Sequence, residues 1–143
     1  MVIESTVKVR YAETDKMGVV YHANYLVWFE IGRTDFLEAL GLPYHLFEEK
    51  GLMSPVVHAE CDYATPLRYG ETAVVRTRLV EATGAKSVFG YEVYRAGQDA
   101  ETEHPCCSGR TVHCFVREGE FKPLSMKKAA PELYEAYCKV LEP

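Results

Sequence analysis

The feature that most restricts the fold is a long apolar segment with helical spacing, residues 24–40. Gly41, directly behind it, is typical of a helix end. One stripe contains Tyr25, Phe29, Gly32, Phe36 and Leu40, and Leu26, Trp28, Ile31 and Leu37 widen it. So wide an apolar arc favours a helix wrapped by a sheet over one lying on a surface. Because Gly costs about 1 kcal/mol in a helix interior relative to Ala, we expect close approach to a strand at Gly32.

Five further segments have the alternation, or the β-branched and aromatic content, that is typical of strands. They are residues 4–11, 56–64, 72–82, 87–95 and 108–118. Between and after them we expect a short helix over 44–50, a hairpin loop over 97–105, and a terminal helix over 125–141 with Pro131 in its first turn or at a kink. This order predicts an α+β fold in which a five-stranded antiparallel sheet curls around the long helix.

Size and charge restrict the class of protein further. A chain of 143 residues without a linker fits one domain, residues 1–143. The formal net charge is −5 with both signs interspersed, so no basic stripe is present for nucleic acid. No apolar run approaches the ~20 residues that span a bilayer, and residues 1–10 lack the apolar core of a signal peptide. We therefore expect a cytoplasmic protein without nucleic-acid or membrane partners.

The cysteines do not form a recognisable framework. Their odd number, five, and their irregular spacing argue against disulfides. A metal site built from 104–107 with 113–114 lacks a chelating CxxC pair, and strand alternation sends His113 and Cys114 to opposite faces. We expect free thiols in a reducing compartment, and no metal.

The candidate chemistry lies within residues 10–38. A polar loop carries the carboxylate of Asp15, Gly18 follows, and residues 21–24 open the long helix. The free N–H groups and positive dipole end of a helix can polarise a carbonyl oxygen. A carboxylate opposite them can attack that carbonyl or activate a water. The arrangement suits acyl transfer, and the absence of a GxSxG elbow argues against an α/β-hydrolase.

This segment resembles the acyl-CoA thioesterases of the 4-hydroxybenzoyl-CoA thioesterase type, which have the hotdog fold. The shared pattern comprises Tyr11, Thr14, Asp15, Gly18, residues 20–25, Glu30, Arg33 and residues 66–71. The resemblance implies an enzyme that hydrolyses a small acyl-CoA thioester to a free acid and CoA. Coenzyme A is then part of the substrate, and no other cofactor is expected. The resemblance also implies a homodimer with a joined sheet, or a homotetramer.

The resemblance assigns catalysis to Asp15, as nucleophile or general base, and the oxyanion site to the backbone N–H of Tyr21. His22 is a further candidate for catalysis, as a second donor, a water-positioning group or a structural helix cap. Asn24 fits a helix N-cap, and its amide is also a candidate for orienting a water or the acyl carbonyl. Glu13 is the rival carboxylate, and we expect it to be solvated.

Coenzyme A is polyanionic, so an acidic protein must hold it with a local cationic group. Lys86, with Ser87 beside it in the turn before a strand, is the first candidate, and Arg68 is the second. Arg95 is also considered, and the alternative for Lys86 is a solvated turn. The acyl group stays open, because an aromatic and an aliphatic pocket both fit the same side chains: Trp28, Phe29, Phe36, Tyr63 and Phe89.

Two other functions are compatible with the predicted fold. A hydratase or dehydratase would centre on a histidine, but His22 lies within the thioesterase-like pattern. A non-catalytic acyl-CoA-binding protein would lack a competent carboxylate, and Asp15 argues against it. Glu30 and Arg33, three residues apart on the helix, are expected to form a structural ion pair.

Overall fold

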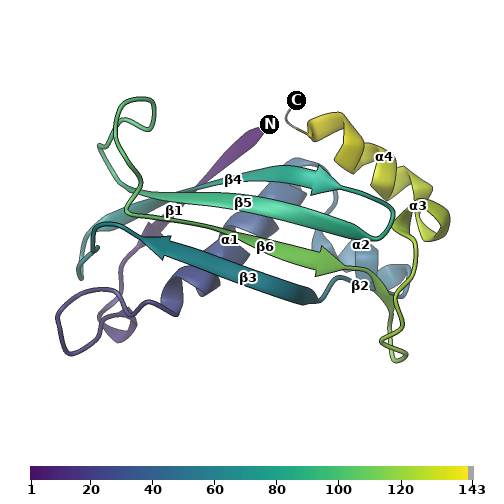
Figure 1. Ribbon diagram of the computed structural model, residues 1–143, viewed down its shortest axis with the longest axis horizontal. Coiled ribbons are helices and arrows are strands. Elements are labelled where there is room, and N and C mark those ends of the chain that lie inside the picture. Colours follow the sequence, from purple (N-terminus) through teal and green to yellow (C-terminus); the bar gives the residue numbers. More distant parts are fainter. Residues whose placement is uncertain (142–143) are drawn as a thin grey trace.

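The computed structural model describes residues 1–141, so residues 142 and 143 of the predicted domain lie outside the described part. Five strands form one antiparallel sheet in the order β1-β4-β5-β6-β3 (Figure 1). The elements, in chain order, are β1 (Val2–Lys8), the 3-10 turn η1 (Tyr11–Glu13), α1 (Asn24–Ala39), α2 (Tyr44–Glu49), β2 (Leu52–Met53), β3 (Val56–Tyr63), β4 (Thr72–Ala82), β5 (Lys86–Arg95), β6 (Cys107–Cys114), β7 (Val116–Arg117), α3 (Met126–Ala129) and α4 (Pro131–Val140).

The sheet curves around α1, which lies behind it in Figure 1 and packs against strands on both sides of the sheet centre. This confirms the predicted α+β architecture and matches the hotdog arrangement. Gly41 has a φ of +79° and its N–H bonds to the carbonyl of Glu38, so it ends the helix as expected.

Gly32 marks the closest approach of α1 to the sheet. A Cβ at this position would collide with Oγ1 of Thr77 and would lie 3.1 Å from Cγ1 of Val75, both on β4. The helix therefore gains close packing against β4 in exchange for the lower helix propensity of glycine. The close contact predicted at Gly32 is confirmed.

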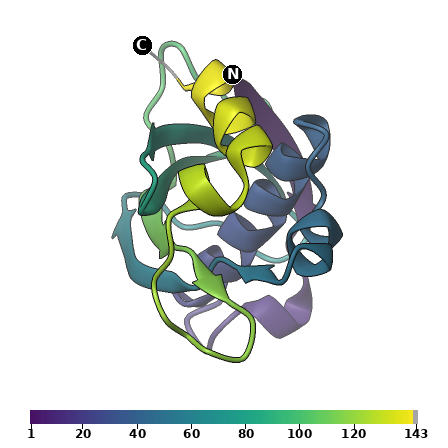
Figure 2. The same cartoon turned by 90° about the vertical axis from the view of Figure 1, so that its right-hand side faces the viewer.

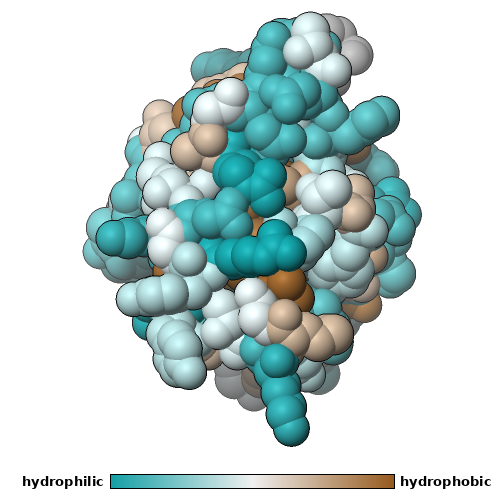
Figure 3. Space-filling model, turned by 90° about the vertical axis from the view of Figure 1, so that its left-hand side faces the viewer, coloured by the Kyte–Doolittle hydropathy of each residue, from teal (hydrophilic) through white to brown (hydrophobic). Residues whose placement is uncertain are grey.

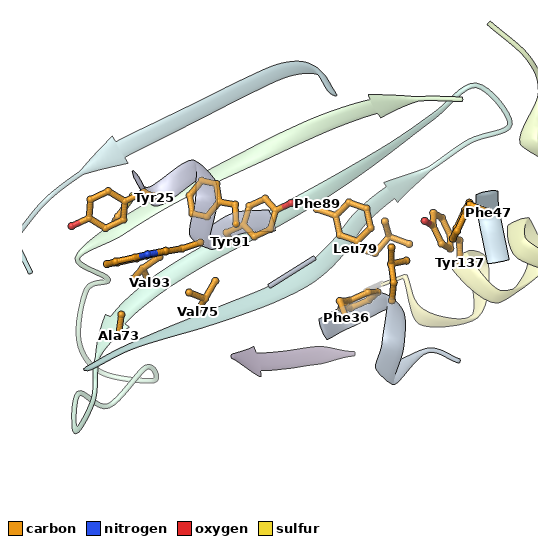
Figure 4. Packing of buried hydrophobic residues seen from close by; sticks show 14 of the residues in the cluster. Tyr25, Phe36, Phe47, Ala73, Val75, Leu79, Phe89, Tyr91, Val93 and Tyr137 are labelled. Atoms are coloured by element: carbon orange, nitrogen blue, oxygen red, sulfur yellow. The ribbon is translucent and has the colours of Figure 1, made fainter. Parts of the chain in front are cut away.

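The core is a row of aromatic and aliphatic side chains along the concave face of the sheet. Figure 4 shows this row running from Tyr25 past Tyr91 to Phe89, and on to Phe47 and Tyr137 beneath the outer helices. Midway along it, the rings of Phe29 and Tyr91 stack with centroids 4.3 Å apart and planes within 4°. This stack divides the interior into two halves.

Several expectations about local structure were wrong in detail. The apolar arc of α1 is only partly covered, because Leu26 and Ile31 are exposed together with Val27. The strand expected over 108–118 is interrupted at Phe115, and its end, β7, pairs with β2 instead. The terminal helix is divided at Ala130 into α3 and α4, since Pro131 begins a new helix.

The two ends of the sheet differ. Figure 2 shows α3 and α4 covering one end, where the β4–β5 turn lies. The opposite end carries the loop of residues 9–23, and in Figure 3 apolar surface is visible there between hydrophilic side chains. Among residues 1–141, no helix combines the length and the apolarity needed to cross a bilayer.

Candidate active site

The loop that precedes α1 is closed on itself around Asp15. The N–H of Asp15 donates to the carbonyl of Val19 at 2.8 Å, and the N–H of Gly18 donates to the carbonyl of Asp15 at 3.0 Å. Oδ1 of Asp15 accepts the N–H of Met17 at 2.8 Å. Gly18 has a φ of +79°, which glycine adopts without strain. One carboxylate oxygen is therefore held by the turn, while Oδ2 has no hydrogen bond within the described residues.

Glu13 anchors this loop to α1, which corrects the expectation that it is solvated. It is only 5% exposed, and its carboxylate accepts the N–H of Arg10 at 2.9 Å and the indole Nε1–H of Trp28 at 2.7 Å. Burial opposes ionisation, but the hydrogen bonds from Arg10 and Trp28 outweigh it and hold the pKa of Glu13 below its usual range. Glu13 is thus a buried structural carboxylate.

The backbone carbonyl of Glu13 organises the start of α1. It accepts the N–H of Tyr21 at 2.8 Å and Nδ2–H of Asn24 at 2.8 Å. Asn24 is consequently the first helical residue and not the N-cap, a position held by Ala23 without a side-chain cap. The predicted capping role of Asn24 is wrong, since its amide is bonded to the loop.

The hydrogen bond from Tyr21 to Glu13 also changes which N–H group can act as the oxyanion donor. The N–H of Tyr21 is already used by Glu13, so the prediction that this group is the free donor does not fit the geometry. The N–H of His22 has no acceptor within residues 1–141. Since the carbonyl of His22 accepts the hydroxyl of Tyr63 at 3.0 Å, the backbone at His22 is fixed from the other side.

A cavity of about 240 Å³ adjoins Asp15 and His22. Tyr25 and Tyr63 form an aromatic part of its lining, with ring centroids 5.6 Å apart, and residues 64–66 also line it. Burial, followed by the neighbouring Cys107 and Cys106, raises the pKa of Tyr25 to about 12, so its phenol stays neutral near pH 7. The cavity therefore combines one carboxylate with neutral aromatic and backbone groups.

Residues 64–66 are held in place by Arg95 of β5 and by Cys106, which directly precedes β6. The N–H groups of Ala64 and Thr65 both donate to the carbonyl of Cys106, at 2.9 and 3.2 Å. The guanidinium of Arg95 bonds to the Glu71 carboxylate and, at 2.8 Å, to the carbonyl of Pro66. Arg95 is thus occupied in fixing this loop. Thr65 was missed at the sequence level, although the neighbouring 66–71 motif pointed to the region.

A family model described as Thioesterase-like superfamily matches residues 9–136. The chain belongs to this superfamily. It is also 44% identical over 138 residues to "Putative acyl-CoA thioesterase YneP" of Bacillus subtilis, covering 96% of both chains.

Two solved structures have the same fold. The chain resembles DHNA-CoA thioesterase from Staphylococcus aureus with a TM-score of 0.88 and 35% identity, covering 97% of this chain and 90% of the other. It also resembles the hypothetical protein TT1821 from Thermus thermophilus, with a TM-score of 0.82 and 36% identity over the whole of both chains. These likenesses confirm the hotdog fold.

The predicted CoA-binding residues of this thioesterase-like chain do not lie together. Arg68 is exposed, has no ion pair within the described residues, and follows the cavity-lining Pro66 by two positions. Lys86 and Ser87 begin β5, at the opposite end of the sheet (Figure 1). From Ser87 to Arg95 the strand spans roughly 26 Å. Nζ of Lys86 pairs with Glu81 at 3.2 Å.

Two sets of predicted contacts need correction. Ser87 is 0% exposed, so its hydroxyl cannot touch a ligand in this conformation. Of the five side chains expected to line the acyl pocket, only Tyr63 adjoins the Asp15 cavity. Trp28, Phe29 and Phe36 are buried in the core instead. Phe89 lines a different cavity under α2 and α4.

Proposed function

We propose that this protein is an acyl-CoA thioesterase that hydrolyses a small acyl-CoA thioester to a free acid and CoA. The observation that carries the proposal is the shared cavity of Asp15 and His22, in which a carboxylate oxygen and a backbone N–H both lack a partner among residues 1–141. The 44% identity to a relative named for this activity supports it.

In this mechanism the thioester carbonyl lies between the Asp15 carboxylate and the start of α1. Oδ2 of Asp15 either attacks the carbonyl carbon or removes a proton from an attacking water. Negative charge develops on the carbonyl oxygen, where the N–H of His22 and the positive end of the α1 dipole stabilise it. The carbon–sulfur bond then breaks and CoA leaves as a thiolate, a good leaving group that needs no Ser-His-Asp triad. If Asp15 was the nucleophile, the acyl group remains on it as an anhydride, which a water hydrolyses to the free acid and the Asp15 carboxylate.

A second subunit is part of this proposal. β3 is an edge strand of the sheet, and nearly all of its side chains are exposed, among them Val56 and Val57. Such an edge favours pairing with another copy. Tyr63 belongs both to this edge and to the cavity wall, so a partner along β3 would also border the site. We propose a homodimer, alone or as half of a homotetramer.

The experiment that tests the activity is a thiol-release assay over a panel of CoA thioesters. The panel contains short-chain, medium-chain and arylacyl groups, because a lining with Tyr25 and Tyr63 does not by itself distinguish an aliphatic from an aromatic acyl group. Release of CoA with kcat/KM in the enzymatic range of about 10⁴ M⁻¹s⁻¹ or above for one class supports the proposal. Binding without release across the whole panel contradicts it and supports a non-catalytic acyl-CoA-binding protein.

A further inference from the structure

A second cavity lies under the helices at the covered end of the sheet. It has a volume of about 320 Å³ and lies between α1, α2, α4 and the strands β5 and β6. It shares no lining residue with the Asp15 cavity. The Phe29–Tyr91 stack lies between the two, and a Cβ on Gly109 of β6 would collide with the Phe29 ring, so this stack is held firmly in place.

The cavity contains a cation that has no counterion in the described part of the chain. Among residues 1–141 the Arg33 guanidinium makes one hydrogen bond, from Nη1 to the hydroxyl of Tyr91 at 3.1 Å. The expected pair with Glu30 is not formed, and no carboxylate of residues 1–141 lies within 4.0 Å of Arg33. A guanidinium has five N–H donors. A half-buried cation with most of its donors unused is stabilised by an incoming anion.

A chain of hydrogen bonds starts at Arg33 and saturates the polar groups behind it. Tyr91 bonds to Thr111 at 2.7 Å, and Thr111 bonds to Nε2 of His113 at 2.9 Å. Nδ1 of His113 bonds to the carbonyl of Ser54 at 3.2 Å. If Nδ1 carries the proton of His113, every donor in this chain has one acceptor.

His113 adds no second charge. It is 1% exposed, and burial, followed by the nearby charge of Arg33, lowers the pKa of His113 to about 4. Near pH 7 it is neutral, so Arg33 is the cationic group of the cavity.

Tyr137 supplies a second unused donor. It lies on α4, is 2% exposed and lines the cavity, yet its hydroxyl has no hydrogen-bond partner within the described chain. This hydroxyl is not among the fully enclosed unpaired side-chain atoms, so it is open to the cavity and can donate to a ligand there. Burial raises the pKa of Tyr137, which keeps this hydroxyl a neutral donor. Arg33 and Tyr137 are thus two donors that an anionic acceptor would satisfy.

The rest of the lining determines the ligand class. Phe47, Phe89 and Leu37 form apolar walls, and Figure 4 shows Phe47 next to Tyr137 at this end of the core. Glu30 also adjoins the cavity and is exposed; its carboxylate repels each negative charge of a ligand, which favours an anion with one charge over an anion with two. We propose that this cavity is a second ligand site for a compact monocarboxylate, whose carboxylate binds Arg33 and Tyr137 and whose apolar body packs on Phe47 and Phe89.

This site is tested by binding, independently of the proposed hydrolysis. Benzoate is titrated into the ¹⁵N-labelled protein, with benzamide as the uncharged probe of the same shape. The expected result is a saturable shift of the amide signals of α2 and α4 with benzoate and little shift with benzamide. The Asp15 loop signals report separately on any binding at the first cavity. Absence of saturable shifts in α2 and α4 at millimolar benzoate overturns the proposal.

Two variants connect the shifts to these side chains. Tyr137→Phe removes one hydroxyl from a packed ring and should raise the Kd for benzoate about tenfold, because it removes a hydrogen bond to a charged group. Arg33→Gln should raise it more. The matched controls are Tyr134→Phe on the same helix and Arg110→Gln on the exposed face of β6, which should leave the Kd unchanged. Unchanged affinity in a folded Tyr137→Phe and a folded Arg33→Gln also overturns the proposal.

Discussion

The carboxylate of Glu13 accepts a 2.7 Å hydrogen bond from the indole of Trp28, and this bond joins the Asp15 loop to the buried face of α1. Glu13 and Asp15 are two residues apart, so displacement of one moves the other. The loop is thus positioned by a buried charge that receives two N–H donors, from Trp28 and from Arg10. This arrangement favours the ionised form of Glu13.

Glu13→Gln should destabilise the protein and reduce kcat. A Gln side chain presents an NH₂ group where one of the two N–H donors now finds an oxygen, so one buried bond is lost at a cost of about 1–3 kcal/mol. Urea unfolding at pH 7 measures the loss, and the thiol-release assay measures kcat. The control is Glu135→Gln, an exposed carboxylate on α4, which should change neither quantity. Wild-type stability in Glu13→Gln would show that the bond to Trp28 has no structural importance.

The hydrogen-bonded pair of Glu13 and Trp28 also predicts that the free energy of unfolding depends on pH. The pKa of Glu13 is lower in the folded state than its ordinary value of 4.5, so the unfolded chain takes up the proton first as the pH falls. The stabilisation by the ionised carboxylate is fully present above pH 4.5 and is lost as the pH falls through the lower folded pKa. The difference in unfolding free energy between wild type and Glu13→Gln should therefore be constant from pH 6 to 8 and shrink below pH 4.5. A difference that stays constant down to pH 3 would contradict this.

Asp15→Asn should keep the fold and lower kcat by about 10²–10⁴, the range for a positioned base. The turn accepts an amide in place of the carboxylate, because Oδ1 only needs to accept the N–H of Met17. Asp99→Asn is a matched control, since Oδ1 of Asp99 accepts the N–H of Glu101 at 2.9 Å in a similar turn outside the cavity. Turnover by Asp15→Asn near the wild-type rate would remove Asp15 from the mechanism.

The large elements could be predicted from sequence because each depends on a regular spacing. The period of α1, the alternation of the strands and the cost of Gly32 in a helix all have a local signature, and the structure confirms them. The errors concern partners that are distant in sequence. Nothing near Glu13 indicates that an indole 15 positions later will bond to it.

Asp15 and His22 do line one cavity, but the oxyanion donor and the CoA contacts depend on partners that are distant in sequence. The carbonyl of Glu13 takes the N–H of Tyr21, whereas the N–H of His22, one residue along the chain, has no acceptor among residues 1–141. Lys86 has the local chemistry of a phosphate contact, but the β4–β5 hairpin places it at the far end of the sheet. The Arg33 cavity needs α1, α2 and α4 together, so no single segment predicts it.

Assembly should depend on the β3 edge. Val57 is 60% exposed on β3, and Val57→Lys places a charge on this edge strand. The substitution should weaken dimerisation, because the lysines of the two subunits would approach each other across the subunit interface. Light scattering at micromolar concentration should then shift toward the ~16 kDa monomer, and activity should fall at low protein concentration. Val2→Lys, on the opposite edge strand β1, is the control and should leave the assembly intact. A fully active wild-type monomer would contradict the proposed homodimer.

Arg68 and Lys86 are the two candidates for binding the nucleotide end of CoA, and their substitutions should affect KM differently. Arg68 follows the cavity-lining Pro66 by two positions and has no ion pair within the described residues, so it is a better candidate than Lys86, which is paired with Glu81 at the far end of the sheet. An exposed phosphate contact contributes about 1 kcal/mol or less, because salt screens it. Arg68→Ala should raise KM severalfold and leave kcat unchanged, since the contact is equal in the ground and transition states.

The defect of Arg68→Ala should shrink at high salt and disappear with a pantetheine thioester that lacks the nucleotide. Lys86→Ala is the matched control. If the nucleotide binds to the same subunit as the acyl group, this variant should behave as wild type. If Lys86→Ala alone raises KM for the CoA thioester but not for the pantetheine thioester, the nucleotide is bound by the far end of another subunit, and Arg68 is a solvated loop residue. If Arg68→Ala is equally impaired on both substrates, its effect comes from the conformation of residues 64–71 and not from a phosphate contact.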